Sequence, residues 1–240
     1  MDSNILLLAE SYVGDLSVTP LTTETYQVVT DKTIKVGRDP DENTIINHPQ
    51  ISRNHLESYS ITVDQESRHG PLIFVRDRRS NSGTYVNDRL IGNASKVSPG
   101  RLLDNGDVVT ISRPAITRLR FIQGPESSPS RLNNLQRRES ELFKDKYEIS
   151  NRTIGDGAHA VVYLATEKRT SCQIVCKIHN LANSYHSTHR LRRVRQEAVL
   201  LSYLDHPNII SIVAAFQTSN TMSVSPSGYG PAFGPDSNTQ

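Results

Sequence analysis

The sequence has little of what several protein classes require. Its 240 residues contain no tryptophan and only two cysteines, Cys172 and Cys176. Two cysteines are too few for a cysteine-rich zinc site or for the disulfide framework of a small secreted domain. No apolar run approaches the ~20 residues that cross a bilayer, and the apolar residues 5–9 lack the basic start and the length of a signal peptide. We therefore expect a soluble intracellular protein with reduced thiols, no metal site and no membrane partner.

A large excess of one charge is also missing. The formal net charge is +2, from 27 basic and 25 acidic residues. A nucleic-acid-binding domain usually has a strong basic excess on one face. The arginines between residues 190 and 195 are interpreted as a solvated helix face, although a phosphate group or nucleic acid also fits such a run. We expect no direct contact with nucleic acid.

Residues 16–122 have the pattern of an antiparallel β-sandwich. Short runs rich in Ile, Val, Tyr and Phe recur at regular intervals, and turn pairs such as Asp-Pro, Asn-Gly and Pro-Gly separate them. The clearest runs are residues 34–36, 59–63, 72–75, 84–86, 108–111 and 119–122. Residues 1–15 are interpreted as an N-terminal tail.

The rest of the chain divides into three parts. Residues 123–146 are rich in Ser, Pro, Asn and mixed charge, which predicts a linker. Residues 147–216 contain strand-like runs and one helix, predicted from apolar residues three or four apart between Leu191 and Leu201. In residues 217–240, Gly, Pro, Ser, Thr and Asn dominate, which predicts a disordered tail. The predicted fold class is mainly β with some α.

Three polar clusters lie at predicted strand ends in residues 16–122. They are Gly37-Arg38, residues 52–55 and residues 80–87. Loops at one end of a rigid sandwich commonly carry binding residues. A phosphothreonine presents about −1.5 to −2 charges and three acceptor oxygens, and the guanidinium and hydroxyl groups of Arg38, Ser52 and Arg53 can donate to them. Taken singly, each residue also fits a turn glycine or a surface ion pair.

Together with Leu-Asp-Asn-Gly-Asp-Val-Val at residues 103–109, the three clusters resemble the forkhead-associated (FHA) domain family. The resemblance covers residues 16–122 and implies a phosphothreonine-binding sandwich. It implies that Arg38 and Ser52 bind phosphate oxygens. The other residues implied at the phosphopeptide site are Arg53, Asn81 and Ser82, and those with structural roles are Gly37, His55, Gly83 and Asn87. Where the family usually has an Asn that holds the ligand backbone, this chain has Ser82, a departure that bears on affinity or sequence preference.

A second set of residues suits nucleotide chemistry. Gly155 and Gly157 form a glycine-rich turn between two predicted strands, where backbone amides can approach phosphates closely. Lys177 follows Gly157 by twenty residues on a predicted strand, and Glu197 follows Lys177 by twenty on the predicted helix. Read separately, these residues also fit an ordinary hairpin, a solvated lysine and half of a surface ion pair.

The spacing resembles the small lobe of a serine/threonine protein kinase, over residues 147–216. The resemblance implies ATP and magnesium as cofactors of the parent family. The residues implied in ATP binding are Gly155, Gly157, Val162, Lys177 and Glu197. Phosphoryl transfer also needs a catalytic-loop aspartate and a magnesium-binding aspartate. After Glu197 the only acidic residues are Asp205 and Asp236, and neither lies in such a motif. We expect a truncated kinase lobe that does not use ATP and magnesium productively and that has no complete catalytic site.

An FHA domain followed by a kinase domain resembles the DNA-damage and meiotic checkpoint kinases, particularly fungal ones. The resemblance implies a nuclear protein that docks on phosphothreonine-containing partners, with self-association through its own phosphorylated segments as a further option. Three hypotheses follow. The chain is a phosphothreonine reader attached to an inactive kinase fragment; or it belongs to a checkpoint kinase whose catalytic half is missing from this gene model or isoform; or it is a free-standing adaptor that competes with the full-length kinase.

Overall fold

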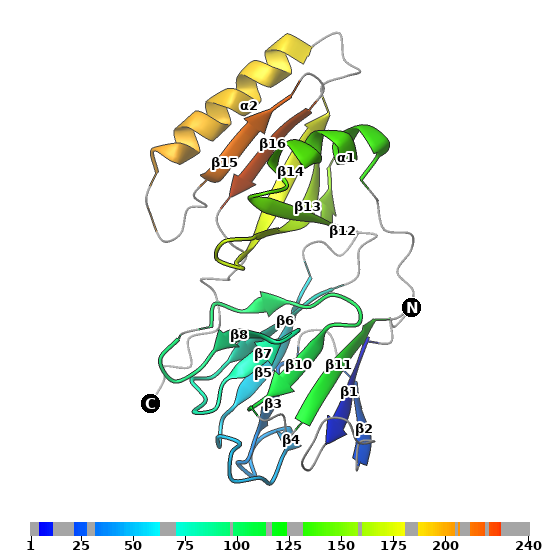
Figure 1. Cartoon of the computed structure of the whole chain (residues 1–240), viewed down its shortest axis with the longest axis vertical. Helices are drawn as coiled ribbons and strands as arrows, with labels where there is room; N and C mark the ends of the chain where they lie inside the picture. Colours follow the sequence, from blue (N-terminus) through cyan, green and yellow to red (C-terminus); the bar gives the residue numbers. More distant parts are fainter. Residues whose placement is uncertain are drawn as a thin grey trace. The chain divides into compact units, whose positions relative to one another are not determined.

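The computed structural model describes residues 5–11, 22–27, 32–62, 71–96, 98–113, 117–123, 132–157, 160–180, 187–204, 206, 212–218 and 221–226. The chain divides into two compact units, Met1–Ser127 and Ser128–Gln240, and each is described by itself (Figure 1). Among the described residues, strands dominate both units, and the helical segments all lie in the second. The predicted fold class, mainly β with some α, is confirmed.

The first unit is a sandwich of two sheets. The six-stranded sheet has the order β2-β1-β11-β10-β7-β8, and the five-stranded sheet has the order β4-β3-β5-β6-β9. All pairings are antiparallel except that of β3 with β4. The strands are β1 (Ile5–Ser11), β2 (Thr22–Gln27), β3 (Ile34–Gly37), β4 (Thr44–Ile45), β5 (Leu56–Ile61), β6 (Leu72–Asp77), β7 (Thr84–Val86), β8 (Arg89–Gly92), β9 (Arg101–Leu102), β10 (Val108–Ile111) and β11 (Thr117–Gln123).

The core of this sandwich is built from β-branched, leucine and phenylalanine side chains that both sheets contribute. Val36 and Val75 come from the five-stranded sheet, and Val109, Leu119 and Phe121 come from the six-stranded one; all are buried in one cluster. Burial of side chains this large stabilises the sandwich by about 1.5–3 kcal/mol each. The two sheets therefore form a rigid base for the loops at their ends.

The N-terminal residues do not behave as predicted. Residues 5–11, interpreted above as part of a tail, form β1, which pairs with β11 from Ile5 opposite Gln123 to Ser11 opposite Thr117. β1 also pairs with β2 on its other side. The prediction is wrong for these residues because the nearby partner, Thr-Thr-Glu-Thr-Tyr-Gln, lacks the apolar pattern of a strand, and the other partner lies more than a hundred positions later in the chain.

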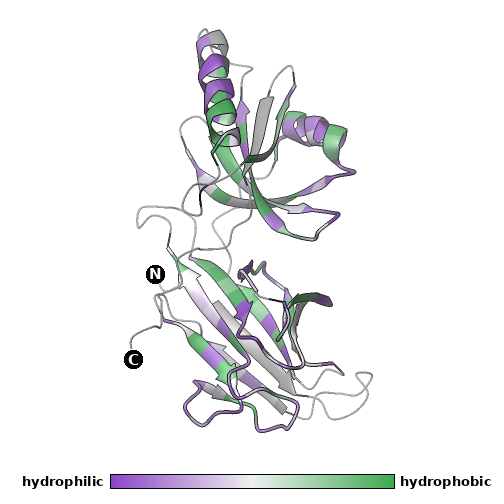
Figure 2. Cartoon of the chain, turned by 90° about the vertical axis from the view of Figure 1, so that its left-hand side faces the viewer, coloured by the Kyte–Doolittle hydropathy of each residue, from purple (hydrophilic) through white to green (hydrophobic). Residues whose placement is uncertain are grey.

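The second unit is a five-stranded antiparallel sheet of order β12-β13-β14-β16-β15. Its elements are α1 (Asn134–Ser140), the 3₁₀ helix η1 (Glu141–Phe143), β12 (Tyr147–Asp156), β13 (Ala160–Glu167), β14 (Gln173–Asn180), α2 (Ser187–Ser202), β15 (Ile212–Gln217) and β16 (Thr221–Pro226). Helix α2 packs Val194 and Ala198 against Ile212 of β15, as its predicted apolar face requires. Val199 and Leu200, near the C-terminal end of α2, are exposed. Figure 2 shows hydrophobic and hydrophilic residues along α2. Within the part of the chain that the structure describes, neither helix has the length and hydrophobicity that a membrane crossing demands.

The predicted linker is wrong for residues 132–146. Asn133 caps α1 through a reciprocal capping box with Gln136. Phe143 stacks on Phe216 with ring centroids 4.7 Å apart, and Leu132 joins the same buried cluster. Polar residues dominate this segment, and Phe216 lies more than seventy positions from Phe143, so composition alone points to a linker.

The predicted disordered tail is also wrong in part. Residues 221–226 form β16, which pairs with β14 on one side and with β15 on the other. Backbone ladder hydrogen bonds do not depend on side-chain type, so a Ser-rich segment can become a strand when it is flanked on both sides. Gln217, also in that prediction, is the last residue of β15. Residues 219–220 and 227–240 lie outside the described residues.

Candidate functional site

Three loops of the first unit meet at Ser52. The backbone N–H of Arg38 donates to the Ser52 carbonyl at 3.0 Å, and the backbone N–H of Asn81 donates to the Ser52 Oγ at 3.0 Å. Arg38 also donates from Nε to the Ile51 carbonyl at 3.2 Å, while its side chain remains exposed. Only one guanidinium N–H is used in that bond, so the others remain available at the surface.

The two other predicted phosphopeptide residues lie in the same loops. Arg53 is exposed, and its carbonyl accepts from the Asp39 N–H at 3.2 Å. Ser82 donates from Oγ to the Gln50 carbonyl at 2.8 Å. The structure thus brings all five predicted residues to one end of the sandwich, where Ser82 links two loops instead of presenting an amide.

Gly37 allows the closest of these loop contacts. A Cβ at this position would lie 1.9 Å from the Arg53 carbonyl oxygen, which is backbone and cannot rotate away. Any side chain here would therefore push apart the segments that carry Arg38 and Ser52.

Replacing Gly37 by alanine should therefore destabilise the sandwich by about 2–3 kcal/mol, because overpacking against backbone forces the loops to move. Gly106→Ala is the matched control, since that glycine also turns the chain, at φ 89°, but a Cβ there meets nothing within 4 Å. Its cost should stay near 1 kcal/mol. Urea unfolding of both variants tests this, and equal losses would contradict the steric argument.

The buried ring of His55 connects two of the loops. Its Nδ1 accepts from the Ser52 N–H at 3.2 Å, and its Nε2 lies 3.2 Å from the Gly83 carbonyl. This pair of contacts fits the neutral ring with its proton on Nε2. Burial lowers the pKa of His55, while the Gly83 carbonyl and the Asp77 charge act in the opposite direction. The ring therefore connects the residue 52 loop to the residue 83 loop as an uncharged brace.

A buried carboxylate, which sequence reasoning missed, shapes the loop that carries Asn81. Asp77 accepts from the Ser80 N–H at 2.8 Å, from the Ser80 Oγ at 2.5 Å and from the Thr84 Oγ1 at 2.6 Å. The Ser80 Oγ accepts in turn from the Gly83 N–H at 3.0 Å. An aspartate favours turns because its side chain accepts from nearby backbone N–H groups, so the sequence could have indicated the turn but not the burial of Asp77.

Asn87 lies away from these loops, in the hairpin between β7 and β8. Asn87 and Asp88 have φ values of 47° and 65°, the conformation that favours Asn in two-residue hairpin turns. The Asn87 side chain also donates to Asp107 at 2.6 Å and accepts from the Val108 N–H at 3.0 Å. Its contacts fasten the turn to the start of β10.

In the second unit the predicted nucleotide residues lie on neighbouring strands. Gly155 of β12 is opposite Val162 of β13, and Val162 is opposite Lys177 of β14. The Lys177 Nζ lies 3.5 Å from the Glu197 Oε1 of α2, with the two side chains 39% and 55% exposed. Gly157 donates to the Ala160 carbonyl at 3.0 Å, whereas residues 158–159 at the tip of the turn lie outside the described residues.

Two known family profiles match the chain, one in each of its two units. The FHA domain profile matches residues 34–112, and the protein kinase domain profile matches residues 148–226. The chain combines FHA and protein kinase domain sequence. Its homologues are meiotic and checkpoint serine/threonine kinases.

Two relatives and one solved structure illustrate this similarity. The meiosis-specific serine/threonine-protein kinase mek1 of Schizosaccharomyces pombe is 29% identical over 75% of this chain and 36% of its own length. The serine/threonine-protein kinase cds1 of the same yeast is 26% identical over 90% of this chain and 45% of its own length. The NMR structure of the yeast Dun1 FHA domain with a doubly phosphorylated peptide is 21% identical, with a TM-score of 0.38, over 56% of this chain and 84% of that one. The chain thus spans less than half the length of these two kinases.

Proposed function

We propose that the first unit binds phosphothreonine-containing segments of partner proteins through Arg38, Ser52, Arg53, Asn81 and Ser82. The observation that carries the proposal is the meeting of three loops at Ser52, beside the exposed Arg38. FHA domains bind phosphothreonine peptides, and the profile match supports the same role for this one.

The place where the three loops meet, called the Ser52 junction from here on, has chemistry that suits a dianionic phosphate. The Arg38 guanidinium supplies a full positive charge at the surface, and charge-assisted hydrogen bonds are roughly twice as strong as neutral ones. Because the Ser52 Oγ already accepts from Asn81, its hydroxyl hydrogen is available to donate to a phosphate oxygen. The backbone contacts around Arg38 and Ser52 fix these donors before the ligand arrives, which lowers the entropic cost of binding.

Titration with a threonine peptide in phosphorylated and unphosphorylated forms tests the proposal directly. Binding should need the phosphate and should weaken as salt increases, because the attraction is electrostatic. Equal affinity for both forms would overturn it.

ATP-dependent protein phosphorylation is a second candidate function, favoured by the Lys177–Glu197 pair. Lys177 fits a role at the nucleotide phosphates, with Glu197 holding the ammonium in place. Magnesium, when bound, neutralises developing charge on the phosphates. The acidic residues after Glu197 are Asp205 and Asp236, and neither lies in a catalytic-loop or magnesium-binding motif. We therefore propose that this 240-residue chain, assayed alone, binds phosphothreonine without transferring phosphate.

Incubation of the chain with magnesium and radiolabelled ATP should give no labelled protein above background. A Lys177→Met variant is the control, because a true activity would fall with it while a contaminating kinase would not. Labelling that depends on Lys177 would overturn the non-catalytic proposal. Reading the genomic frame beyond the codon for residue 226 decides separately whether a longer product supplies the missing aspartates.

The relatives also suggest a cellular role. They include a meiosis-specific kinase and a DNA damage response kinase, and we propose for this chain a checkpoint-type role in the nucleus. Self-association through phosphorylated segments of its own sequence would use the same Ser52 junction. An adaptor that competes with a full-length kinase would use it too.

A further inference from the structure

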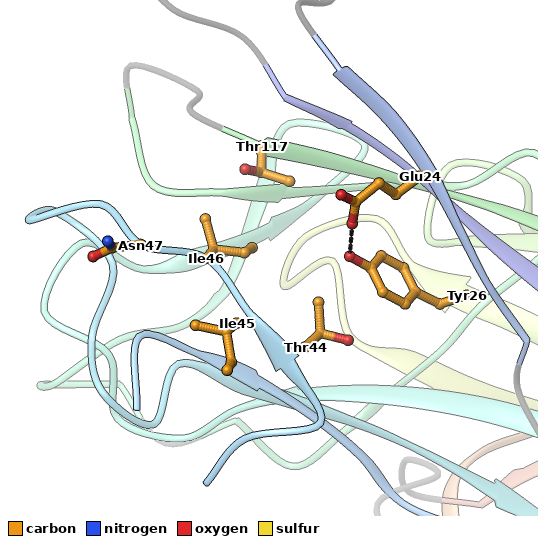
Figure 3. A pocket seen from close by; sticks show the side chains of 7 residues that line it. All are labelled: Glu24, Tyr26, Thr44, Ile45, Ile46, Asn47 and Thr117. Carbon is orange, nitrogen blue, oxygen red and sulfur yellow. Dashed lines mark hydrogen bonds between the residues drawn. The ribbon is translucent and has the colours of Figure 1, made fainter. Parts of the chain in front are cut away.

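A small pocket of about 170 Å³ opens on the first unit between the edge strands of its two sheets (Figure 3). One wall comes from Glu24 and Tyr26 on β2, the edge of the six-stranded sheet. The opposite wall comes from β4, the edge of the five-stranded sheet, and from the residues that follow it. The side chains drawn in Figure 3 surround one hollow. None of the residues that line it belongs to the predicted phosphate site.

The pocket lies at the same end of the sandwich as the Ser52 junction. Ile45 on its wall pairs with Gly37, and the Ile46 N–H donates to the Gly37 carbonyl at 2.8 Å. Arg38 is the next residue. Neighbouring strands are about 4.8 Å apart and an extended peptide advances about 3.3 Å per residue. A peptide whose phosphate is held by Arg38 therefore needs only a few residues to reach the pocket.

The pocket lining has a negative charge and no positive one. Glu24 is the only charged residue among the residues that line it, and Tyr26 donates its hydroxyl hydrogen to the Glu24 carboxylate. Burial, followed by the hydrogen bond to Glu24, raises the pKa of Tyr26 to about 12, so the phenol stays neutral and its ring forms part of the wall.

The other groups of the pocket suit a long side chain with a donor at its end. Ile45 is 54% exposed, and with Ile46 it offers an aliphatic surface. Thr117, at the start of β11, is 1% exposed, and its Oγ1 has no hydrogen-bond partner among the described residues. That oxygen is covered by other atoms, so the acceptor that the pocket offers to such a donor is the exposed carboxylate of Glu24.

From these groups we propose that the pocket receives a lysine or arginine side chain of the bound phosphopeptide, a few residues from the phosphothreonine. The aliphatic stem packs on Ile45 and Ile46, and the cationic end reaches Glu24 and the face of Tyr26. A leucine in the same place would bury polar groups without partners, and an acidic residue would be repelled by Glu24. This inference rests on phosphothreonine binding at the Ser52 junction and adds a second specificity element to it.

Phosphothreonine peptides that carry Arg, Lys, Ala, Leu or Glu at one fixed position, from four residues before the phosphothreonine to four after it, test the inference. Fluorescence anisotropy should reveal one position at which Arg or Lys binds about three- to tenfold tighter than Ala or Leu, the range between an exposed and a charge-assisted pair. Glu24→Gln should abolish that preference and leave the affinity for the Ala peptide unchanged. Glu24→Lys should reverse it in favour of the Glu peptide.

Asp88→Asn is the matched control, because it removes one negative charge from an exposed hairpin turn outside the pocket lining. It should keep the preference for Arg or Lys. The inference is overturned if no position favours a basic residue, if Leu binds as well as Arg, or if Glu24→Gln and Asp88→Asn have the same effect. Failure of wild type to bind any of the phosphorylated peptides would instead remove the proposed function, and this inference with it.

Discussion

Replacing Arg38 by alanine should raise the Kd for a phosphothreonine peptide roughly 30- to 900-fold, which corresponds to about 2–4 kcal/mol. The exposed guanidinium is the charged donor beside Ser52, and its loss removes the charge-assisted bonds to the phosphate. Arg38→Ala also removes the bond from Nε to the Ile51 carbonyl, but the backbone contact from the Arg38 N–H to the Ser52 carbonyl does not involve the side chain and should keep the loop in position. Isothermal titration calorimetry measures the affinity, and thermal unfolding checks that the fold is unchanged.

Two further variants separate charge from geometry. Arg38→Lys keeps the charge but lacks the planar fork, so it should bind with intermediate affinity. Arg89→Ala removes the same charge from an exposed position at the start of β8 and should bind like wild type. If Arg38→Ala and Arg89→Ala weaken binding equally, the effect belongs to net charge, and Arg38 does not hold the phosphate.

The parts of the fold that could be predicted from the sequence are those with a local signal. Alternating apolar runs predicted the central strands, and the spacing of Leu191, Val194 and Ala198 predicted α2. The missed elements, β1, α1 and β16, each contact partners remote in the chain, although β1 and β16 also pair with the nearby strands β2 and β15. Phe143 illustrates the difficulty, because it stands in a mostly polar segment with Leu142 as its apolar neighbour. Its role in the core becomes clear only from its stacking on Phe216.

The candidate site divides in the same way. Arg38 directly follows β3, and Ser52 lies in the loop before β5. Both side chains are polar, so residue type and spacing were enough to single them out. Asp77 is the last residue of β6. From the sequence alone, a carboxylate at the end of a strand cannot be distinguished from an ordinary surface charge. Its burial to 6% exposure and its three donors depend on how the following loop folds back, which no local pattern specifies. The residues that shape the site were therefore harder to predict than the residues proposed to touch the ligand.

Replacement of the buried carboxylate of Asp77 has the largest expected effect on stability. Asp77→Ala should lower the free energy of unfolding of the first unit by about 3–5 kcal/mol, because it leaves buried donors of Ser80 and Thr84 without an acceptor. Phosphopeptide affinity should fall as well, since the loop that holds Asn81 loses its shape. Urea denaturation monitored by circular dichroism measures the first effect, and peptide titration under native conditions measures the second.

A double variant distinguishes lost hydrogen bonds from a general defect. Thr84→Val removes one buried donor while nearly keeping its shape, so it should cost less than Asp77→Ala. In the Asp77→Ala background the valine should add little cost or restore some stability, because the unsatisfied Thr84 hydroxyl is gone. Full additivity of the two losses would show that Asp77 and Thr84 are not coupled. The loop would then owe its shape to the His55 contacts with Ser52 and Gly83 rather than to the buried carboxylate.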